Sequence, residues 1–485
     1  MTLRPLPLLL LGALAVSACD SGSDVDCAVT PSAAECAAQN RAAVLDAAYD
    51  TTGTTITVTD DGASGVAPGG VTWTAGFTYV LQNKVFVNAD QILTIEPGTV
   101  VKGRPGLREQ STALIIARGG QIQANGTAQN PIIFTAQADD VANSNDEPDA
   151  GSWGGLILLG KASTNTTPGT VAIEGINTNE PRGLYGCGDA GFDCDDDDNS
   201  GTVRYVSIRY GGSEIGEGNE INGLTMGGVG RGTTVEYVEV FKNQDDGFEW
   251  FGGTVNARYL VSAFTGDELF DTDQGYRGNN QYLLGIADAT TDNGFEMDGG
   301  DARLGGEDAT PLSTPTFANV TLIGAGANRA ARIKENAAPR FFRSIFTGFD
   351  RGIDVQRVTV EGTGAEIDGD SESRLADGTI QFRNNILGRF TADNYAAGQS
   401  YTLAYLQNVA NGNRLTGSSN AVTSISTMRD GGLNPRSTGD ATTGLGSAPS
   451  GAFFENSTCI GAVCGADWTR GWTALSQLGY TATGA

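Results

Sequence analysis

A short segment recurs along the second half of this 485-residue chain, and it constrains the fold more than any other feature. Each copy places an acidic or amide residue three positions before an apolar one. The apolar positions follow one another at intervals of roughly 20 to 40 residues. The apolar column contains Phe248, Phe270, Phe295, Ala331 and Ile353. A repeat of this length without helical periodicity predicts a solenoid in which each coil stacks on the preceding one.

A second β-prone stretch follows in each coil, where β-branched and aromatic residues alternate with polar ones. Examples lie at 203–208, 235–240, 317–322 and 380–386. This alternation places one face of each strand inward. The chain also has 69 glycines, which are typical of turns between short strands. The sequence therefore predicts an all-β solenoid whose repeated turn holds the Asp and Asn column.

Two regions resemble known families. Segments 93–102, 113–127, 131–135 and 153–156 resemble the first coils of right-handed β-helix proteins of the pectin-lyase-like superfamily. The closing segment 453–473 is similar to the end of a family of bacterial surface lipoproteins. These resemblances imply a right-handed parallel β-helix, but they imply no particular activity, because one fold hosts many functions.

We expect four parts along the chain. They are a lipoprotein signal peptide (1–18), a lipidated cysteine with a flexible tether (19–70), the parallel β-helix (71–390) and a C-terminal capping region packed on the helix (391–485). A solenoid must cover its open ends. We therefore expect residues 71–87 to cover the N-terminal end, and Trp468 and Trp472 to help cover the C-terminal end.

The N-terminus has the features of an export signal. Arg4 precedes an apolar stretch at 6–16 that contains a proline and is too short to span a bilayer. Residues 16–19 resemble a lipobox, which implies cleavage before Cys19 and acylation of its side chain; the alternative is an ordinary signal peptide with an unrelated cysteine. Acyl chains anchor a protein to a membrane. We therefore expect an exported, lipid-anchored protein at the outer membrane or cell surface.

The other six of the seven cysteines fall into short local pairs. In an exported chain, an even set of close pairs predicts disulfides. The expected bonds are Cys27–Cys36, Cys187–Cys194 and Cys459–Cys464.

Composition excludes several functions. The formal charge of −27 disfavours binding to nucleic acid, so we exclude it as a partner. The chain has no histidine, which rules out Ser-His-Asp and Cys-His catalysis and imidazole metal sites. Any chemistry must use carboxylates, Arg, Lys, Tyr or a hard cation.

Charged residues alternate with the inward residues of the repeated strand and should form outward columns. One column holds Glu249, Asp271, Glu296, Arg332 and Asp354, and a parallel column holds Phe251, Asp273, Asp298, Lys334 and Gln356. Strands in neighbouring coils lie about 4.8 Å apart. Ionising all four clustered carboxylates costs free energy, because like charges repel. We therefore expect that at least one of them has a raised pKa, that a cation binds, or that the neighbouring Arg and Lys neutralise them. The candidate site, catalytic or binding, is Asp271, Asp273, Glu296, Asp298, Arg332 and Lys334.

The segments 271–273 and 332–334 resemble pieces of polygalacturonase motifs, which place acids and an Arg/Lys pair on this face of a β-helix. The Gly-His-Gly element of those enzymes is missing, and the order and spacing match only loosely. Three interpretations stay open: a solvated acidic face, a surface that binds sugar or calcium, and a catalytic site.

A second candidate site lies in the acidic run 193–201. The alternate oxygens of Asp195, Asp197 and Asn199 resemble the start of a calcium loop. Ser200 stands where an EF-hand has glycine, and Val206 where it has glutamate, which rules out an EF-hand but not a simpler loop. The alternative is a solvated acidic loop.

The sequence therefore favours a cell-surface β-helical lipoprotein with a binding or structural role. The expected partners are the membrane, through Cys19, and a polysaccharide, matrix or outer-membrane protein, with calcium as the expected cofactor. The alternative is a polysaccharide lyase or polygalacturonase-like hydrolase that acts on acidic glycans.

Overall fold

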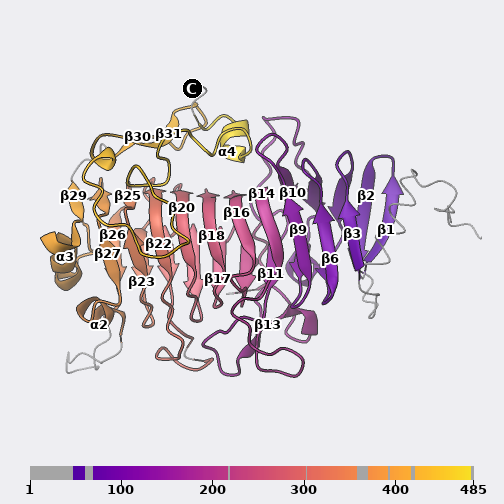
Figure 1. Cartoon of the computed structure of the whole chain (residues 1–485). Helices are drawn as coiled ribbons and strands as arrows, with labels where there is room; N and C mark the ends of the chain where they lie inside the picture. The colour runs from indigo at the N-terminus through magenta and orange to yellow at the C-terminus, as the bar shows by residue number, and fades with distance from the viewer. Residues whose placement is uncertain are drawn as a thin grey trace, which may run out of the picture.

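The computed structural model describes residues 47–60, 69–216, 219–301, 303–357, 370–391, 394–416 and 421–481. Short strands stack coil upon coil into a right-handed parallel β-helix (Figure 1). The predicted fold is therefore confirmed. The signal peptide (1–18), Cys19 and the Cys27–Cys36 pair lie outside the described residues. Within the described part, no helix is long and apolar enough to cross a membrane.

One sheet of nine parallel strands forms the face that carries the repeat segment. Its strands are β5 (Lys84–Val87), β8 (Ala113–Ile116), β11 (Leu156–Leu159), β15 (Leu224–Gly227), β17 (Phe248–Phe251), β19 (Phe270–Asp273), β21 (Phe295–Met297), β23 (Arg329–Ile333) and β26 (Arg351–Val355).

An 18-stranded sheet forms the rest of the coil wall. Its strands are β1 (Ala47–Thr52), β2 (Thr55–Asp60), β3 (Gly69–Trp73), β4 (Thr78–Leu81), β6 (Gln91–Ile95), β7 (Val100–Gly103), β9 (Gln121–Asn125), β10 (Ile132–Ala136), β14 (Gly201–Arg209), β16 (Thr234–Phe241), β18 (Asn256–Ala263), β20 (Asn279–Ile286), β22 (Thr316–Ile323), β24 (Arg340–Phe342), β25 (Ile345–Thr347), β27 (Gln381–Arg383), β28 (Ile386–Gly388) and β29 (Arg414–Thr416).

The first strands begin earlier than the sequence suggested. Strands β1 and β2 pair antiparallel, and β2 pairs in parallel with β4 of the coil stack. Both strands fall inside the range 19–70 that was expected to be a tether. Residues 47–60 therefore belong to the folded part of the chain.

The interior is built from aligned apolar side chains. Phe248, Phe270 and Phe295 are fully buried, and their rings stack with centroids 5.6 and 5.2 Å apart. The strand register pairs these three residues in successive coils. The predicted column and its inward direction are confirmed. The residues next to each phenylalanine therefore point outward.

The long strands of the larger sheet bend at a left-handed residue. Tyr205, Tyr237, Tyr259 and Tyr282 have φ between 47° and 62° and lie one above another. Their rings stack with centroids 4.4, 4.3 and 4.9 Å apart. We call this column the tyrosine ladder. Stacking aligns the bends of neighbouring coils and offsets the backbone cost of the left-handed conformation.

Residues 421–481, which we call the strap, run along the side of the coil stack. They contain β30 (Val422–Ile425), β31 (Leu433–Ser437), η5 (Gly439–Thr442) and α4 (Ala474–Gln477). They lie opposite the loops around β13 (Leu184–Gly186) (Figure 1). Trp472 packs edge-on against Tyr205 and Tyr237, and Trp468 against Tyr237 and Tyr259.

The two tryptophans therefore do not cover the C-terminal end, and that expectation is wrong. They pack in the middle of the stack against the tyrosine ladder, whose rings are hydrophobic and favour edge-to-face contacts. Other short helices complete the described chain: α2 (Ser371–Ala376), α3 (Ser400–Gln407), η1 (Arg108–Gln110), η2 (Pro181–Gly183) and η4 (Val409–Asn411). Helix α3 contacts β26 and β29.

An insert at residues 160–200, between β11 and β14, covers part of the nine-stranded sheet. It contains β12 (Thr170–Ala172) and β13 (Leu184–Gly186). The Cys187–Cys194 disulfide closes a loop within the insert, and Cys459–Cys464 closes a loop in the strap. Both predicted bonds are confirmed.

Candidate functional site

The outward column of the nine-stranded sheet changes character along the stack. It begins with apolar Phe86, Ile115 and Ile157, continues through Thr225 and becomes acidic at Glu249. The remaining rungs are Asp271, Glu296, Arg332 and Asp354, in the predicted order. The structure therefore brings the acidic and basic residues of the candidate site together on one face.

This face is less exposed than the sequence suggested. Glu249 keeps only 7% of its surface exposed. Tyr185 of the insert packs against Phe251 with ring centroids 6.0 Å apart, and its hydroxyl donates to Gln274 Oε1 at 2.5 Å. The insert therefore screens the first acidic rungs from solvent, which strengthens every electrostatic interaction there.

The basic residues neutralise one end of the acidic cluster. Lys334 Nζ lies 2.5 Å from Glu296 Oε2 and 3.3 Å from Asp298 Oδ2. Arg332 Nη1 lies 3.1 Å from Glu296 Oε1. These carboxylates raise the pKa of Lys334 despite its partial burial. Lys334 therefore stays charged at neutral pH.

Asp271 lies beyond this neutralised end. Its Oδ1 is buried and has no hydrogen-bond partner. Burial, followed by the charges of Asp298 and Glu268, raises the pKa of Asp271 well above its usual range. Burial also raises the pKa of Asp273 to about 6. Protons or a cation must balance these charges at neutral pH.

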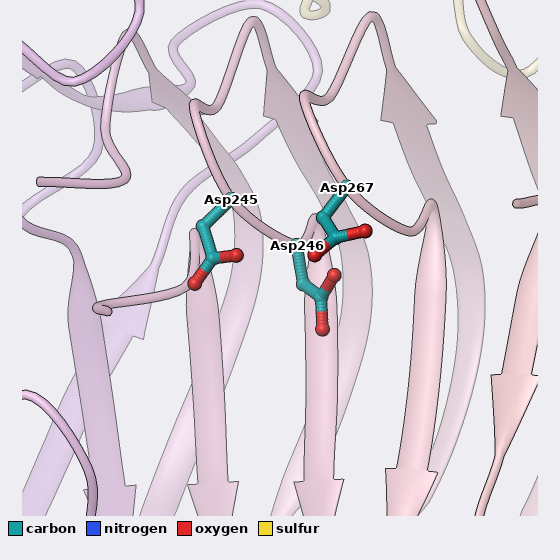
Figure 2. Close-up of side chains that lie close together, drawn as sticks. All are labelled: Asp245, Asp246 and Asp267. Carbon is teal, nitrogen blue, oxygen red and sulfur yellow. The ribbon is translucent and has the colours of Figure 1, made fainter. Parts of the chain in front are cut away.

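The structure adds further carboxylates to the candidate site. The sequence analysis placed some of them only in a turn and did not single out the others. Asp245 and Asp246 precede β17, and Asp267 precedes β19 in the next coil; Figure 2 shows the three side chains close together. One oxygen from each lies within 4.8 Å of the others. The same holds for Asp246, Glu249 and Asp271, and for Asp267, Glu268 and Asp292.

The sequence contained a signal for these residues. Each turn holds two adjacent polar residues, as in Asp245-Asp246, Asp267-Glu268 and Asp292-Asn293. The repeat indicates a turn former at the first member of each pair, and its strand alternation does not extend to the second. The second members Asp246, Glu268 and Asn293 are nearly fully buried beside the candidate site.

Glu174 joins the cluster from the insert. Asn222 Nδ2 donates to Glu174 Oε1 at 2.7 Å and also to Glu249 Oε2. Burial raises the pKa of Glu174 to about 7, against the lowering effect of hydrogen bonds to Glu249 and Asn222. Two carboxyl groups bridged by one amide favour a shared proton. No motif in the sequence links Glu174 to the repeat, because the insert has no place in the coil period.

The loop of the second candidate site is held by local contacts. Asp195 lies 3.7 Å from Lys161 Nζ, Asp197 lies 2.8 Å from Arg231 Nη1, and Asn199 Oδ1 accepts from the Gly201 amide at 2.8 Å. The intervening Asp196 and Asp198 fasten the loop to the amides of Ser163 and Lys161. Calcium binding by Asp195, Asp197 and Asn199 stays a prediction.

Known proteins identify the fold of this chain. The family model described as pectate-lyase-like β-helix domain matches residues 65–473. No curated protein and no solved structure matches the chain significantly. The chain belongs to the family of pectate-lyase-like β-helix domains.

Proposed function

We propose that this protein is an exported, lipid-anchored β-helical binding protein that uses its acidic face to bind a divalent cation, most simply calcium. One observation carries the proposal. Oxygens of Asp246, Glu249 and Asp271 lie within 4.8 Å of one another on adjacent turns and strands. Carboxylate oxygens gathered at such distances are the ligands that calcium prefers.

Two buried residues beside these carboxylates also have neutral side-chain oxygens. Thr225 occupies the rung beside Glu249, is 1% exposed and has a hydroxyl without a hydrogen-bond partner. Asn222 is equally buried, and its Oδ1 is also unpartnered. Buried polar atoms without partners cost roughly 1 to 3 kcal/mol each. A bound cation would give these oxygens a partner. It would also replace the protons that the carboxyl groups otherwise keep because burial raises their pKa values.

The proposed macromolecular partner is an acidic glycan, and the alternative partner is a matrix or outer-membrane protein. Arg332 supports this choice, because 42% of its side chain is exposed next to the acidic rungs. A bound cation and an exposed guanidinium together suit a ligand with carboxylate groups. Acylation of Cys19 would hold the protein at the outer membrane or cell surface.

Hydrolysis of such a glycan is the second candidate function. The observation in its favour is the Glu174 carboxyl, whose raised pKa of about 7 suits a general acid at neutral pH. A lyase that uses Lys334 as its base is disfavoured, because Glu296 and Asp298 keep that side chain protonated.

The test uses the full chain with Cys19→Ala, which removes the lipid. Calcium chloride should raise its melting temperature, since a ligand at a hundredfold excess over its Kd adds about 2.7 kcal/mol of stability. Asp271→Asn should abolish the shift. The matched control Asp90→Asn, at an exposed turn in the first coils, should keep it.

A panel of acidic polysaccharides, with calcium or chelator, then separates the two functions. Calcium-dependent binding without new chain ends supports the binding protein. Cleavage that disappears in Glu174→Gln supports the hydrolase. If calcium leaves the melting temperature of the parent chain unchanged, the proposed function is wrong. If Asp197→Asn removes the shift and Asp271→Asn does not, the cation binds the acidic loop instead.

A further inference from the structure

The tyrosine ladder is a continuous stack of rings across four coils. From Tyr205 through Tyr237 and Tyr259 to Tyr282, successive rings are 4.4, 4.3 and 4.9 Å apart, with interplanar angles of 10°, 5° and 18°. All four residues keep a left-handed backbone, which costs free energy for a residue with a side chain. The fold therefore holds four oxidisable rings in direct contact, an arrangement in which an electron passes readily from one ring to the next.

The strap adds two indole rings to this stack. Trp468 lies edge-on 5.3 Å from Tyr259, and Trp472 lies edge-on 5.7 Å from Tyr205. The indole N–H of Trp468 donates to the carbonyl of Ala462 at 2.9 Å, and that of Trp472 donates to the carbonyl of Trp468 at 2.8 Å. An indole N–H is only a donor, and a backbone carbonyl is a poor base. An oxidised indole at either position therefore keeps its proton, and such a radical cation is a strong oxidant toward the tyrosine that it contacts.

Tyr259 differs from the other ladder residues in having a proton acceptor. Its hydroxyl donates to Oε2 of Glu455 at 2.9 Å, and Arg258 Nη1 lies 2.6 Å from Oε1 of the same carboxylate. Among the described residues, no other ladder hydroxyl donates to a carboxylate. A phenol gives up its proton when it is oxidised, and the transfer needs an acceptor within hydrogen-bond reach. The side chain of Glu455 is 43% exposed and can pass this proton to water, so an oxidising equivalent in the stack is most stable at Tyr259.

We propose that the tyrosine ladder, together with Trp468 and Trp472, relays single electrons and protects the chain from one-electron oxidants such as organic peroxyl radicals. A peroxyl radical takes one electron from an indole and one proton from water, and becomes a hydroperoxide. Tyr259 returns an electron to the indole through the stack and gives its proton to Glu455. A small external thiol then restores Tyr259 with one electron and one proton.

The sum of these steps is the transfer of one hydrogen atom from the thiol to the peroxyl radical. The activity is independent of cation or glycan binding, because the ladder lies on the 18-stranded sheet and the acidic face on the nine-stranded sheet.

The experiment is pulse radiolysis of the full chain with Cys19→Ala in azide solution, where the azide radical oxidises indoles first. Absorbance then follows the decay of tryptophan radicals and the growth of tyrosyl radicals. Two other tryptophans also stack on tyrosines, so the ladder is isolated by comparing variants. Tyr259→Phe keeps a ring in the stack but removes the oxidisable phenol. It should lose part of the tyrosyl signal and lengthen the life of the tryptophan radicals. The control Tyr401→Phe, at a residue that is 43% exposed on helix α3, should match the parent.

A second variant tests the proton acceptor. Glu455→Gln keeps a side-chain oxygen for the hydrogen bond but removes the base, so the tyrosyl radical of the ladder should form more slowly than in the parent. A nitroso spin trap, followed by peptide mapping, should mark Tyr259 in the parent and not in this variant. Circular dichroism checks that each variant is folded.

Protection is measured with peroxyl radicals from a thermal azo initiator in the presence of a thiol. Tyr259→Phe should then accumulate more oxidised Trp468 and Trp472 than the parent. Equal decay of the tryptophan radicals in the parent, Tyr259→Phe and Glu455→Gln would overturn the relay. Equal oxidation of the two indoles in parent and Tyr259→Phe would overturn its protective role.

Discussion

Neighbouring groups decide the state of each carboxylate on the acidic face. Glu296 and Asp298 both contact Lys334, whereas Asp271, one rung away from Glu296, has a buried oxygen without a partner. Lys334 neutralises Glu296 and pairs with Oδ2 of Asp298, whose Oδ1 is buried without a hydrogen-bond partner. Asp271 requires a proton or an external cation, because burial opposes its charge. Carboxylates on neighbouring rungs of this face therefore differ in what they can bind.

Replacing Lys334 should expose this difference. Lys334→Met removes the partner of two partly buried carboxylates, so the free energy of unfolding should fall by about 2 to 3 kcal/mol. Urea unfolding at neutral pH measures the change. The matched control is Lys161→Met, because Lys161 lies 3.7 Å from Asp195 and both side chains are exposed by more than a third. Its cost should stay below about 0.5 kcal/mol. Equal losses in the two variants would contradict the assignment.

The sequence predicted the outward columns from the alternation of a strand, which is a local property. It correctly aligned Glu249, Asp271, Glu296 and Arg332. It did not predict the roles of Asp246 and Glu268, because a turn has no fixed alternation from which the direction of a side chain follows. Glu174 depends on how the insert folds back, and this is a long-range contact without a periodic signal.

At the scale of elements, the strap joins distant coils. The α4 amides of Ala474 and Leu475 donate to the two oxygens of Glu239 at 2.6 and 3.2 Å, and Ser207 Oγ donates to the same carboxylate. Glu239 is fully buried. Arg209 Nη2 donates to Gln477 at 2.6 Å. Helix α4 therefore has its N-terminus fixed to the middle of the stack by one carboxylate.

Glu239→Ala should release this end of the strap. Loss of the acceptor leaves buried donors unsatisfied and should cost about 2 to 3 kcal/mol. Limited proteolysis should then cut within residues 421–481 faster than in the parent chain. The control Glu236→Ala lies on the same strand, where its carboxylate is 3.6 and 3.7 Å from Arg204 and Arg258 in a partly exposed row. It should cost less than about 1 kcal/mol. Unchanged proteolysis in Glu239→Ala would argue against this fastening.

The sequence predicted the coil strands well, because each contains its own alternation and β-branched residues. The strap was not predicted as a lateral element. Its tryptophans were assigned to the end of the stack because a solenoid needs covered ends, which says nothing about which surface an apolar side chain contacts. The tyrosine ladder that receives them becomes visible only when coil register is known.

At the scale of the whole molecule, the acidic face should make stability depend on pH. Burial raises the pKa of Glu174 to about 7 and that of Asp273 to about 6, and it also raises the pKa of Asp271. The folded state then binds more protons than the unfolded state between about pH 4 and 7. In chelator, the stability that these three groups contribute should therefore be fully present below their unfolded pKa values near pH 4 and should be lost as the pH rises through the raised ones.

Calcium should reverse this loss, because it replaces the protons on the same oxygens. Melting curves from about pH 5 to 8, with chelator or calcium chloride, test the effect. The calcium-induced gain should grow with pH. Asp271→Asn should reduce the slope in chelator and abolish the gain, and Asp90→Asn should change neither. A gain that does not depend on pH would show that the cation binds elsewhere.

The aligned left-handed bends also limit which insertions a chain of this kind can accept. The column continues from Tyr282 through Asn319, Arg343 and Asn384, so an insertion of one residue would break the stacking, whereas a whole coil could be added without a change in register. Each added coil lengthens the stack by about 4.8 Å. The strap, however, connects fixed points, from Arg343 near one end to Arg209 in the middle. The strap therefore spans a fixed number of coils between these two points. A coil can be added or lost beneath it only if the strap changes its own length as well.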